Sequence, residues 1–276
     1  MGAAPRTPFA GTLVSACAVL GLLAAACGSD DARTTEATAG TTGVGTASSP
    51  ALSGPVVVFA AASLAAAYTE IGDAFQTEHP DVDITFSFDS SSNLVAQIGE
   101  GAPADVFASA DQPSMARLAD AGGNAGEPIV FATNSMQIIV EAGNPQGIAA
   151  VADLADPDIV YITCAPEVPV GAYGAQVLAD AGVAVTPASF EENVKGIVTK
   201  VTGGEADAGI VYATDVIAAG LAAEGVAIPA DVNVVATYPV VVTTAAVNAE
   251  GARSFVDFVV GAQGQAILAS HGFGAP

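Results

Sequence analysis

From residue 55 to the end of the chain, short apolar runs alternate with segments whose apolar residues recur every three or four positions. This alternation constrains the fold more than any other feature of the sequence. Val56–Ala60 is a continuous apolar run, as expected of a strand that is covered on both faces. One helical face is then formed by Leu64, Ala67, Ile71, Ala74 and Phe75. Alternating strand and helix signals over about 220 residues predict an α/β fold.

The alternation continues along the chain. Further strands are predicted at Ile84–Phe88, Asp105–Ser109, Ile159–Thr163 and Gly209–Tyr212. Further helices are predicted around residues 94–98, 172–181, 191–202 and 253–271, the last as one helix or two. Two apolar runs, Ile129–Ala132 and Met136–Val140, are separated by Thr-Asn-Ser, and a strand at Val234–Thr244 is expected to be broken at Tyr238-Pro239.

The first residues of the chain read as an export signal. Arg6 is followed by an uncharged run that ends in LLAAAC, so residues 1–26 are predicted to be a signal peptide. A single transmembrane anchor is the alternative. The small residues before Cys27 resemble the lipobox of bacterial lipoproteins, which implies that Cys27 is lipidated and becomes the mature N-terminus. Cys17 follows a second, weaker match.

Composition limits what the exported part can bind. Residues 27–54 consist of the lipidated cysteine and a segment rich in Gly, Ser, Thr, Ala and Asp, which predicts a flexible linker. Removal of residues 1–26 leaves 5 Lys and Arg against 29 Asp and Glu, a net charge of 5 − 29 = −24. Such a charge argues against nucleic acid as a partner. Cys164 is then the only other cysteine, so no disulfide is expected within the exported domain.

Catalytic motifs are not found in the sequence. His79 and His271 are the only histidines, neither has neighbours that mark a catalytic triad, and no GxSxG motif occurs. No His or Cys cluster suggests zinc, and no GxxxxGK[ST] motif suggests a nucleotide. Asp105 and Asp111 are expected to cap or brace turns. We therefore predict a protein that is not an enzyme and that needs no cofactor.

Neutral polar groups stand at three predicted strand-to-helix turns. Ser63 opens the first helix, Ser90–Ser92 opens the second, and Val168–Gly171 precedes a third. Such turns can direct backbone N–H groups and hydroxyls at an anion, because the helix dipole favours negative charge there. The alternative for each serine is an ordinary N-cap. Three such turns in an exported α/β chain favour anion binding.

Five sequence blocks carry a specific resemblance. They are VFAAASLAAAYTEIGDAF, FDSSSNLVAQIGEGAPADVFASAD, PEVPVGAY, ENVKGIV and GIVYATD. In this order they resemble the periplasmic molybdate-binding proteins of ABC transporters, and they span nearly all of residues 55–276. The GAPADVFASAD part is shared with wider relatives that bind sulfate or iron. The resemblance implies a two-lobed type II periplasmic binding protein with its ligand cleft between the lobes.

The resemblance also implies a ligand set for molybdate or tungstate. The hydroxyls fall on Ser63, on Ser91 within the Ser90–Ser92 triplet, and on Tyr212. The backbone amides fall on Val170 and Val194. Molybdenum would then be held as an oxyanion with no direct metal ligands, and which serine of the triplet contributes stays open.

The lobes implied by the resemblance are discontinuous, with residues 55–132 and 240–276 in the first lobe and residues 133–239 in the second. The protein is expected to be a lipid-anchored monomer outside the cytoplasm that passes its ligand to a membrane permease. Sulfate or ferric iron remains an alternative ligand, although ferric iron is usually coordinated by several phenolates or carboxylates. A serine hydrolase and a surface adhesin are alternatives of other classes. The sequence leaves open the choice between molybdate and tungstate, the affinity and the permease.

Overall fold

The structure is a computed structural model that describes residues 51–276. The predicted signal peptide (residues 1–26), Cys27 and the predicted linker as far as residue 50 lie outside the described residues. The first strand, β1 (Gly54–Ala61), begins two residues before the apolar run that predicted it. In the part of the chain that the structure describes, no helix is long and apolar enough to cross a bilayer.

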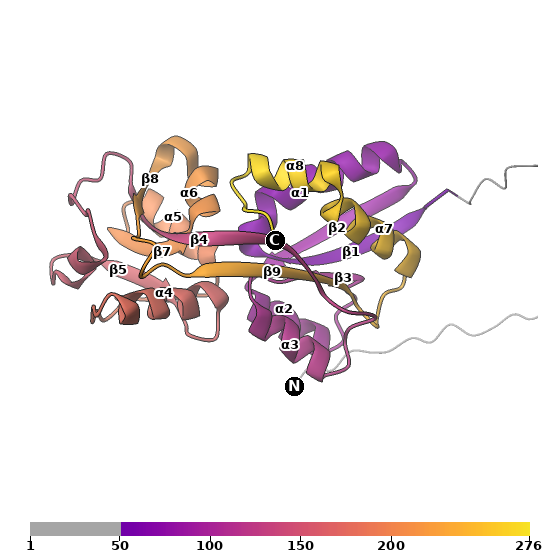
Figure 1. Cartoon of the computed structure of the whole chain (residues 1–276), viewed down its shortest axis with the longest axis horizontal. Helices are drawn as coiled ribbons and strands as arrows, with labels where there is room; N and C mark the ends of the chain where they lie inside the picture. Colours follow the sequence, from indigo (N-terminus) through magenta and orange to yellow (C-terminus); the bar gives the residue numbers. More distant parts are fainter. Residues whose placement is uncertain (1–50) are drawn as a thin grey trace, which may run out of the picture. The chain divides into compact units, whose positions relative to one another are not determined.

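The first lobe is built on parallel strands, with helices on both faces of its sheet (Figure 1). β1 pairs in parallel with β2 (Val82–Asp89) and β3 (Val106–Ala108), and β3 pairs antiparallel with β9 (Val235–Val242). The helices that cover this sheet are α1 (Ala65–Glu78), α2 (Ser91–Gly99), α3 (Gln112–Asp120), α7 (Ala249–Val260) and α8 (Ala262–Ser270). The sheet is therefore buried between two helical layers, as its apolar strands require.

The second lobe repeats this design with shorter strands. Its strands are β5 (Tyr161–Cys164), β6 (Phe190–Glu191), β7 (Ala208–Tyr212) and β8 (Ala223–Ala227). Its helices are α4 (Pro169–Asp180), α5 (Val194–Thr202) and α6 (Ala213–Ala219). Within residues 51–276 there are also three short 3₁₀ turns, η1 (Ala62–Leu64) in the first lobe and η2 (Val151–Ala155) and η3 (Gly220–Ala222) in the second.

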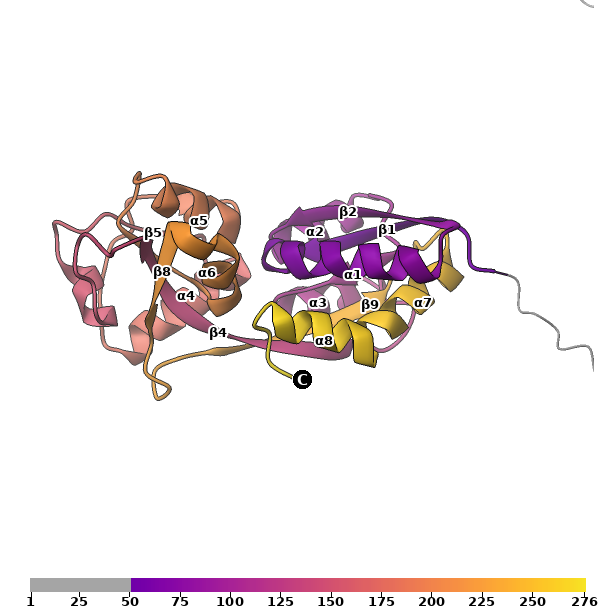
Figure 2. The same ribbon diagram turned by 90° about the horizontal axis from the view of Figure 1, so that it is seen from above.

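Two long strands connect the lobes. β4 (Ile129–Glu141) pairs with β9 through residues 129–135 and with β7 and β8 through residues 136–141. Figures 1 and 2 show β4 and β9 running side by side from one lobe to the other. The α/β fold with two lobes, predicted from the sequence, is confirmed by the structure.

One predicted strand break, at Tyr238-Pro239, is wrong, and the two apolar runs on either side of Thr133–Ser135 form a single strand. Thr133–Ser135 does not interrupt β4, because these residues pair with residues 235–237 of β9 where the two strands pass between the lobes. β9 likewise continues through Pro239, which pairs with Val130 where the register shifts. A bulge is a position that tolerates a residue without a backbone N–H.

Several helix boundaries also differ from the prediction. α4 begins at Pro169, because a proline suits the first position of a helix, and α5 begins only at Val194, after the short strand β6. Helix α3 was not predicted, and Asp111 caps it by accepting a hydrogen bond from the Ser114 amide at 3.1 Å. The closing segment forms two helices, α7 and α8.

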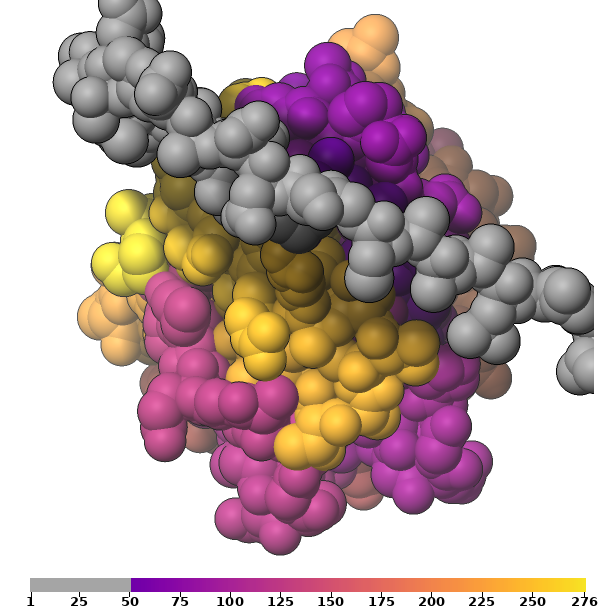
Figure 3. Space-filling view, turned by 90° about the vertical axis from the view of Figure 1, so that its right-hand side faces the viewer, coloured from indigo at the N-terminus to yellow at the C-terminus, as the bar shows by residue number. Residues whose placement is uncertain are grey.

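Both ends of the described chain contribute to the first lobe. Asn248, at the start of α7, donates hydrogen bonds from Nδ2 to the carbonyl oxygens of Ser53 at 2.9 Å and Pro55 at 3.2 Å. Figure 3 views this end of the molecule, where the gold C-terminal residues fill the middle of the face between the indigo and magenta segments. Asp105 braces this region by accepting bonds from the amides of Val57 at 2.7 Å and Asn248 at 3.1 Å.

Candidate functional site

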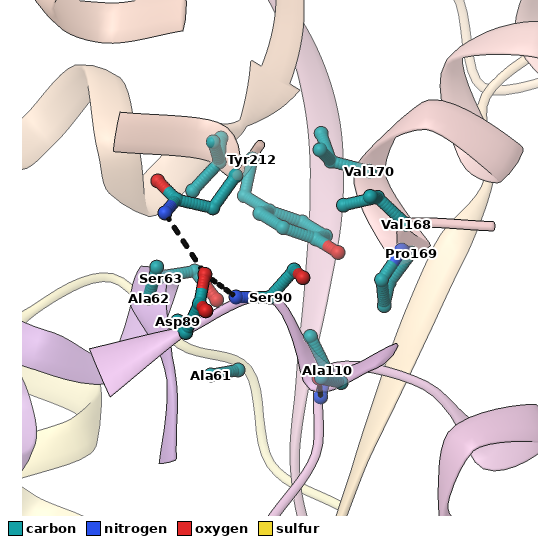
Figure 4. Close-up of a pocket in the computed structure, with 13 residues that line it drawn as sticks. Ala61, Ala62, Ser63, Asp89, Ser90, Ala110, Val168, Pro169, Val170 and Tyr212 are labelled. Atoms are coloured by element: carbon teal, nitrogen blue, oxygen red, sulfur yellow. Dashed lines mark hydrogen bonds between the residues drawn. The ribbon is translucent and has the colours of Figure 1, made fainter. Parts of the chain in front are cut away.

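One pocket is lined by all five residues that the sequence assigned to the ligand. Its walls come from both lobes, and they consist mainly of small or aliphatic side chains, hydroxyls and the first turns of helices (Figure 4). The lining residues are Ala61, Ala62, Ser63, Asp89, Ser90, Ser91, Ala110, Val168, Pro169, Val170, Asn193, Val194 and Tyr212. The pocket encloses a cavity of ≈ 20 Å³. Because one water needs about 10–15 Å³ by this measure, the space suits a small compact ligand.

Ser63 is buried in η1 and does not cap a helix. Its side chain makes no capping hydrogen bond, and helix α1 follows only after Leu64. Its Oγ instead lies 3.1 Å from the hydroxyl oxygen of Tyr238, which is fully buried in β9. The interpretation of Ser63 as an N-cap is therefore wrong.

The three serines at the start of α2 have different roles. Ser90 is the N-cap, since its Oγ accepts a bond from the Asn93 amide at 3.3 Å. Ser91 is buried and lines the pocket, and its Oγ accepts a bond from the Ala110 amide at 2.9 Å. Ser92 is half-buried and is not among the lining residues. The structure thus leaves Ser90 and Ser91 at the pocket and removes Ser92.

Val170 and Val194 are each in the first turn of a helix. Val170 is the second residue of α4, and Val194 is the first residue of α5. Amides at these positions have no acceptor within their own helix, and the helix dipole places partial positive charge there. Asn193 caps α5, because its side-chain oxygen accepts a hydrogen bond from the Lys195 amide at 3.1 Å. The cap is therefore bonded to the amide of Lys195 and not to that of Val194.

Tyr212 ends β7 and presents an unpartnered hydroxyl at the pocket. The side chain is 2 % exposed, and its hydroxyl oxygen has no hydrogen-bond partner among the described residues. Figure 4 shows the ring reaching between Ser63 and Ser90 on one side and Val170 on the other. Burial, and then the neighbouring Tyr238, Tyr173 and acidic groups, raise the pKa of Tyr212 well above its ordinary value of 10.0. The hydroxyl therefore stays protonated and can donate.

Two polar lining residues, Asp89 and Asn193, were missed by the sequence prediction. The Asp89 carboxylate accepts a bond from Asn193 Nδ2 at 3.1 Å, which joins the end of β2 in the first lobe to the start of α5 in the second. Asp89 also accepts from the Ser90 amide at 2.7 Å and from Asn93 Nδ2 at 3.2 Å. Asp89 begins the Asp-Ser-Ser-Ser run, but its partner Asn193 is 104 residues away, and no local pattern marks such a pair.

Positive side chains do not line this pocket. None of its lining residues, all of which lie within residues 61–212, is Lys, Arg or His. Lys195 is close in sequence, but its Nζ pairs with the buried Asp215 at 2.9 Å. No group of three or more metal-binding side chains occurs among residues 51–276. The pocket therefore offers hydroxyls and amides, which suit an anion held by neutral donors.

Comparisons with known proteins agree with this geometry. The profile of the family described as bacterial extracellular solute-binding protein matches residues 56–274. A protein of Mycobacterium tuberculosis named molybdate-binding protein ModA is 40% identical over 270 residues, which is 96% of this chain and 97% of that protein. The Escherichia coli protein of the same name is 32% identical over 238 residues, 80% of this chain and 89% of that protein.

Solved structures show the same fold. The periplasmic molybdate-binding protein of Azotobacter vinelandii superposes with a TM-score of 0.70 at 24% identity, covering 80% of this chain and 99% of that chain. The sulfate-binding protein SubI of Mycobacterium tuberculosis superposes with a TM-score of 0.68 at 23% identity, covering 79% of this chain and 86% of that chain. Since this family binds solutes and is not enzymatic, the prediction that the protein is not an enzyme is confirmed. The chain belongs to the bacterial extracellular solute-binding proteins, within the family of molybdate-binding proteins.

Proposed function

We propose that this protein captures molybdate or tungstate between its lobes outside the cytoplasm and delivers it to the permease of an ABC transporter. One observation carries the proposal: Ser63, Ser91, Val170, Val194 and Tyr212, which come from both lobes, line one pocket that no cationic side chain lines. The ligands are the hydroxyls of Ser63, Ser91 and Tyr212 and the amides of Val170 and Val194. The molybdate-binding relatives support the choice of ligand.

The strength of neutral donors is sufficient for such a ligand. Five hydrogen bonds to a charged group contribute about 1.5–3 kcal/mol each, and micromolar affinity requires about 8 kcal/mol. Association itself costs free energy, so the donors must be held in place before the ligand arrives. The buried hydroxyl of Tyr212 meets this condition, because it has no competing partner among the described residues.

Sulfate is the second candidate ligand, and titration separates the two. The purified protein, in the form that the cell exports, is titrated calorimetrically with molybdate, tungstate, sulfate and phosphate. We expect molybdate and tungstate to bind far more tightly, because donors spaced for molybdate would meet the smaller sulfate only over longer hydrogen bonds. Equal affinity for sulfate and molybdate would refute the proposed selectivity. Ferric iron is disfavoured, because the lining residues include one carboxylate, Asp89, and one phenol, Tyr212.

Closure of the two lobes couples binding to delivery. We propose residues 55–132 with 240–276 as the first lobe and residues 133–239 as the second, with β4 and β9 as the hinge. The donors are divided between the lobes, so the ligand gains its full set only when the lobes are closed. The hydrogen bond between Asn193 and Asp89 supports this arrangement, since it joins the two lobes beside the pocket. A monomer suffices for this mechanism.

The proposed location is the outer surface of the cell membrane, with residues 1–26 as a signal peptide and Cys27 as the lipidated residue. These residues lie outside the described part of the chain, and the proposal follows from the sequence and from the extracellular family. Cys27→Ser is expected to move the protein from the membrane fraction to the soluble fraction with molybdate affinity unchanged. Cys17→Ser is the matched control, and loss of anchoring in that variant alone would place the lipid on Cys17.

A further inference from the structure

A chain of buried polar side chains leads from the strands that cross between the lobes to Ser63. The Tyr238 hydroxyl on β9 lies 3.1 Å from Ser63 Oγ and 3.4 Å from Asn134 Nδ2 on β4. Asn134 Nδ2 also donates to Thr214 Oγ1 at 2.8 Å. All four residues are buried, with at most 6% of any one exposed. The three hydroxyls and Asn134 Nδ2 are paired within this network, whereas Asn134 Oδ1 has no hydrogen-bond partner among the described residues. Because buried polar groups are costly to leave unpaired, the paired groups hold their hydrogens in a defined arrangement.

The Asn134 amide group sets the direction of the hydrogen bond between Tyr238 and Ser63. Either hydroxyl could donate in that bond. Because Asn134 Nδ2 can only donate, the Tyr238 oxygen accepts from it, and the single phenol hydrogen is left for Ser63. Burial raises the pKa of Tyr238, which keeps this hydrogen in place at neutral pH. The oxygen of Ser63 therefore accepts, and its own hydrogen is free to point into the pocket.

Ser91 is also held as a hydrogen-bond donor, in its case by a backbone amide. Its Oγ accepts a bond at 2.9 Å from the backbone amide of Ala110, which can only donate. Ser63 and Ser91, the two serines proposed as ligands, thus each receive a hydrogen bond from the protein, and each is left with one hydrogen to give. Asp89, the one lining carboxylate, already accepts hydrogen bonds from the backbone amide of Ser90 and from the side chains of Asn93, Gln97 and Asn193.

We propose that Tyr238, held by Asn134, is a positioning residue that fixes Ser63 as a donor and so makes the site reject oxyanions that carry a proton. This inference rests on the proposed function and deepens it, since it explains selectivity at the same pocket. Hydrogen phosphate has an O–H group at neutral pH, whereas molybdate and sulfate have none. In the pocket, the hydrogen of hydrogen phosphate would face groups that donate hydrogen bonds. The Tyr212 oxygen could accept this hydrogen only if the Tyr212 hydroxyl turned its own hydrogen away from the anion, and the lost bond lowers the affinity.

The test measures selectivity in Tyr238→Phe, which removes one hydroxyl and keeps the ring. Calorimetric titrations with molybdate, sulfate and hydrogen phosphate are compared with those of the unaltered protein. We expect molybdate and sulfate to bind about tenfold more weakly, by the same factor, while hydrogen phosphate loses less or gains. The preference for molybdate over hydrogen phosphate then falls, and the preference over sulfate is kept. An unchanged preference over hydrogen phosphate would overturn the inference.

A matched control and a double-mutant cycle separate positioning from general damage. Tyr68→Phe removes the same atom from an equally buried ring whose hydroxyl has no partner among the described residues, and it should alter none of these ratios. In a Ser63→Ala background, Tyr238→Phe should have no further effect on molybdate affinity, because its action passes through Ser63. An effect of the same size in both backgrounds would show a structural role and refute the inference.

A second variant covers the case in which Tyr238→Phe does not fold. Asn134→Ala keeps the phenol but frees it to accept from Ser63, which turns the Ser63 hydrogen away from the pocket. The same fall in preference over hydrogen phosphate is expected, and an unchanged preference counts against the inference. Failure of the unaltered protein to bind molybdate would contradict the proposed function. If it instead binds sulfate, the cycle is run with sulfate and tests the inference separately.

Discussion

At the scale of single residues, Tyr212 offers the sharpest test of the pocket. Its hydroxyl is buried and has no partner among the described residues, so Tyr212→Phe removes a donor without breaking a bond of the empty protein. We expect the melting temperature without ligand to change little. Molybdate affinity should fall about ten- to a hundredfold, from the loss of one charge-assisted bond of about 1.5–3 kcal/mol. Thermal melting with and without molybdate, together with calorimetry, measures both quantities.

The control for Tyr212 is again Tyr68→Phe, whose hydroxyl is equally buried but lies away from the pocket. This variant should keep the affinity and the stabilisation by ligand, which depends on ligand concentration relative to Kd. If Tyr212→Phe instead lowered the melting temperature of the empty protein and kept its affinity, Tyr212 would be a structural residue and not a ligand.

At the scale of elements, the position of α4 depends on one glycine beside the pocket. A Cβ on Gly171 would collide with the backbone oxygens of Ala165 and Cys164, which cannot move independently of the chain. Gly171→Ala should therefore displace the first turn of α4, including the amide of Val170. We expect a loss of about 1–3 kcal/mol in the free energy of unfolding and a loss of about tenfold in molybdate affinity. Denaturant unfolding and calorimetry measure the two effects.

Gly174 lies on the same helix and provides the matched comparison. A Cβ there would meet its nearest neighbour, Ile210, at 3.6 Å, which is an ordinary contact. Gly174→Ala should therefore leave affinity unchanged, and alanine should favour the helix slightly. Equal losses of affinity in both variants would show that the effect belongs to the helix as a whole and not to the displaced amide.

At the scale of the whole molecule, the buried tyrosines predict loss of stability in alkali. Burial raises the pKa of all five, Tyr68, Tyr161, Tyr173, Tyr212 and Tyr238. The unfolded chain ionises its tyrosines near pH 10, before the folded protein does. The folded state then binds more protons than the unfolded state, so the free energy of unfolding should fall as pH rises above about 10. Denaturant unfolding between about pH 8 and pH 11 measures this decline.

Ultraviolet titration of tyrosinate gives an independent check on the same point. In the folded protein, little tyrosinate should form near pH 10, whereas in strong denaturant all five residues should ionise there. A folded protein that titrates its tyrosines at the ordinary pH, with constant stability up to pH 11, would contradict the burial on which the prediction depends.

The sequence by itself determined the α/β class, because alternating periodicity is a local property of neighbouring residues. It also determined the candidate ligands Ser63, Ser91, Val170, Val194 and Tyr212 through motif resemblance, and all five line one pocket in the structure. Positions at the starts of helices can be inferred in this way, since each donor depends on a short segment of chain. The starts of α4 at Pro169 and α5 at Val194 differ from the predicted helix starts by up to three residues. The reason is that the periodic pattern of apolar residues does not mark the exact residue at which a helix begins.

Only the tertiary structure decided how these donors are held. The bond of Ser63 to Tyr238 joins residues 175 apart, and that of Asp89 to Asn193 joins residues 104 apart. Pro239 remains in β9 because a bulge lies opposite it on β4, which no property of its own segment shows. Periodicity and motifs report on residues that are close in sequence. The direction of a buried hydroxyl depends on which distant strands pack against it, and that is known only once the lobes and their crossing strands are in place.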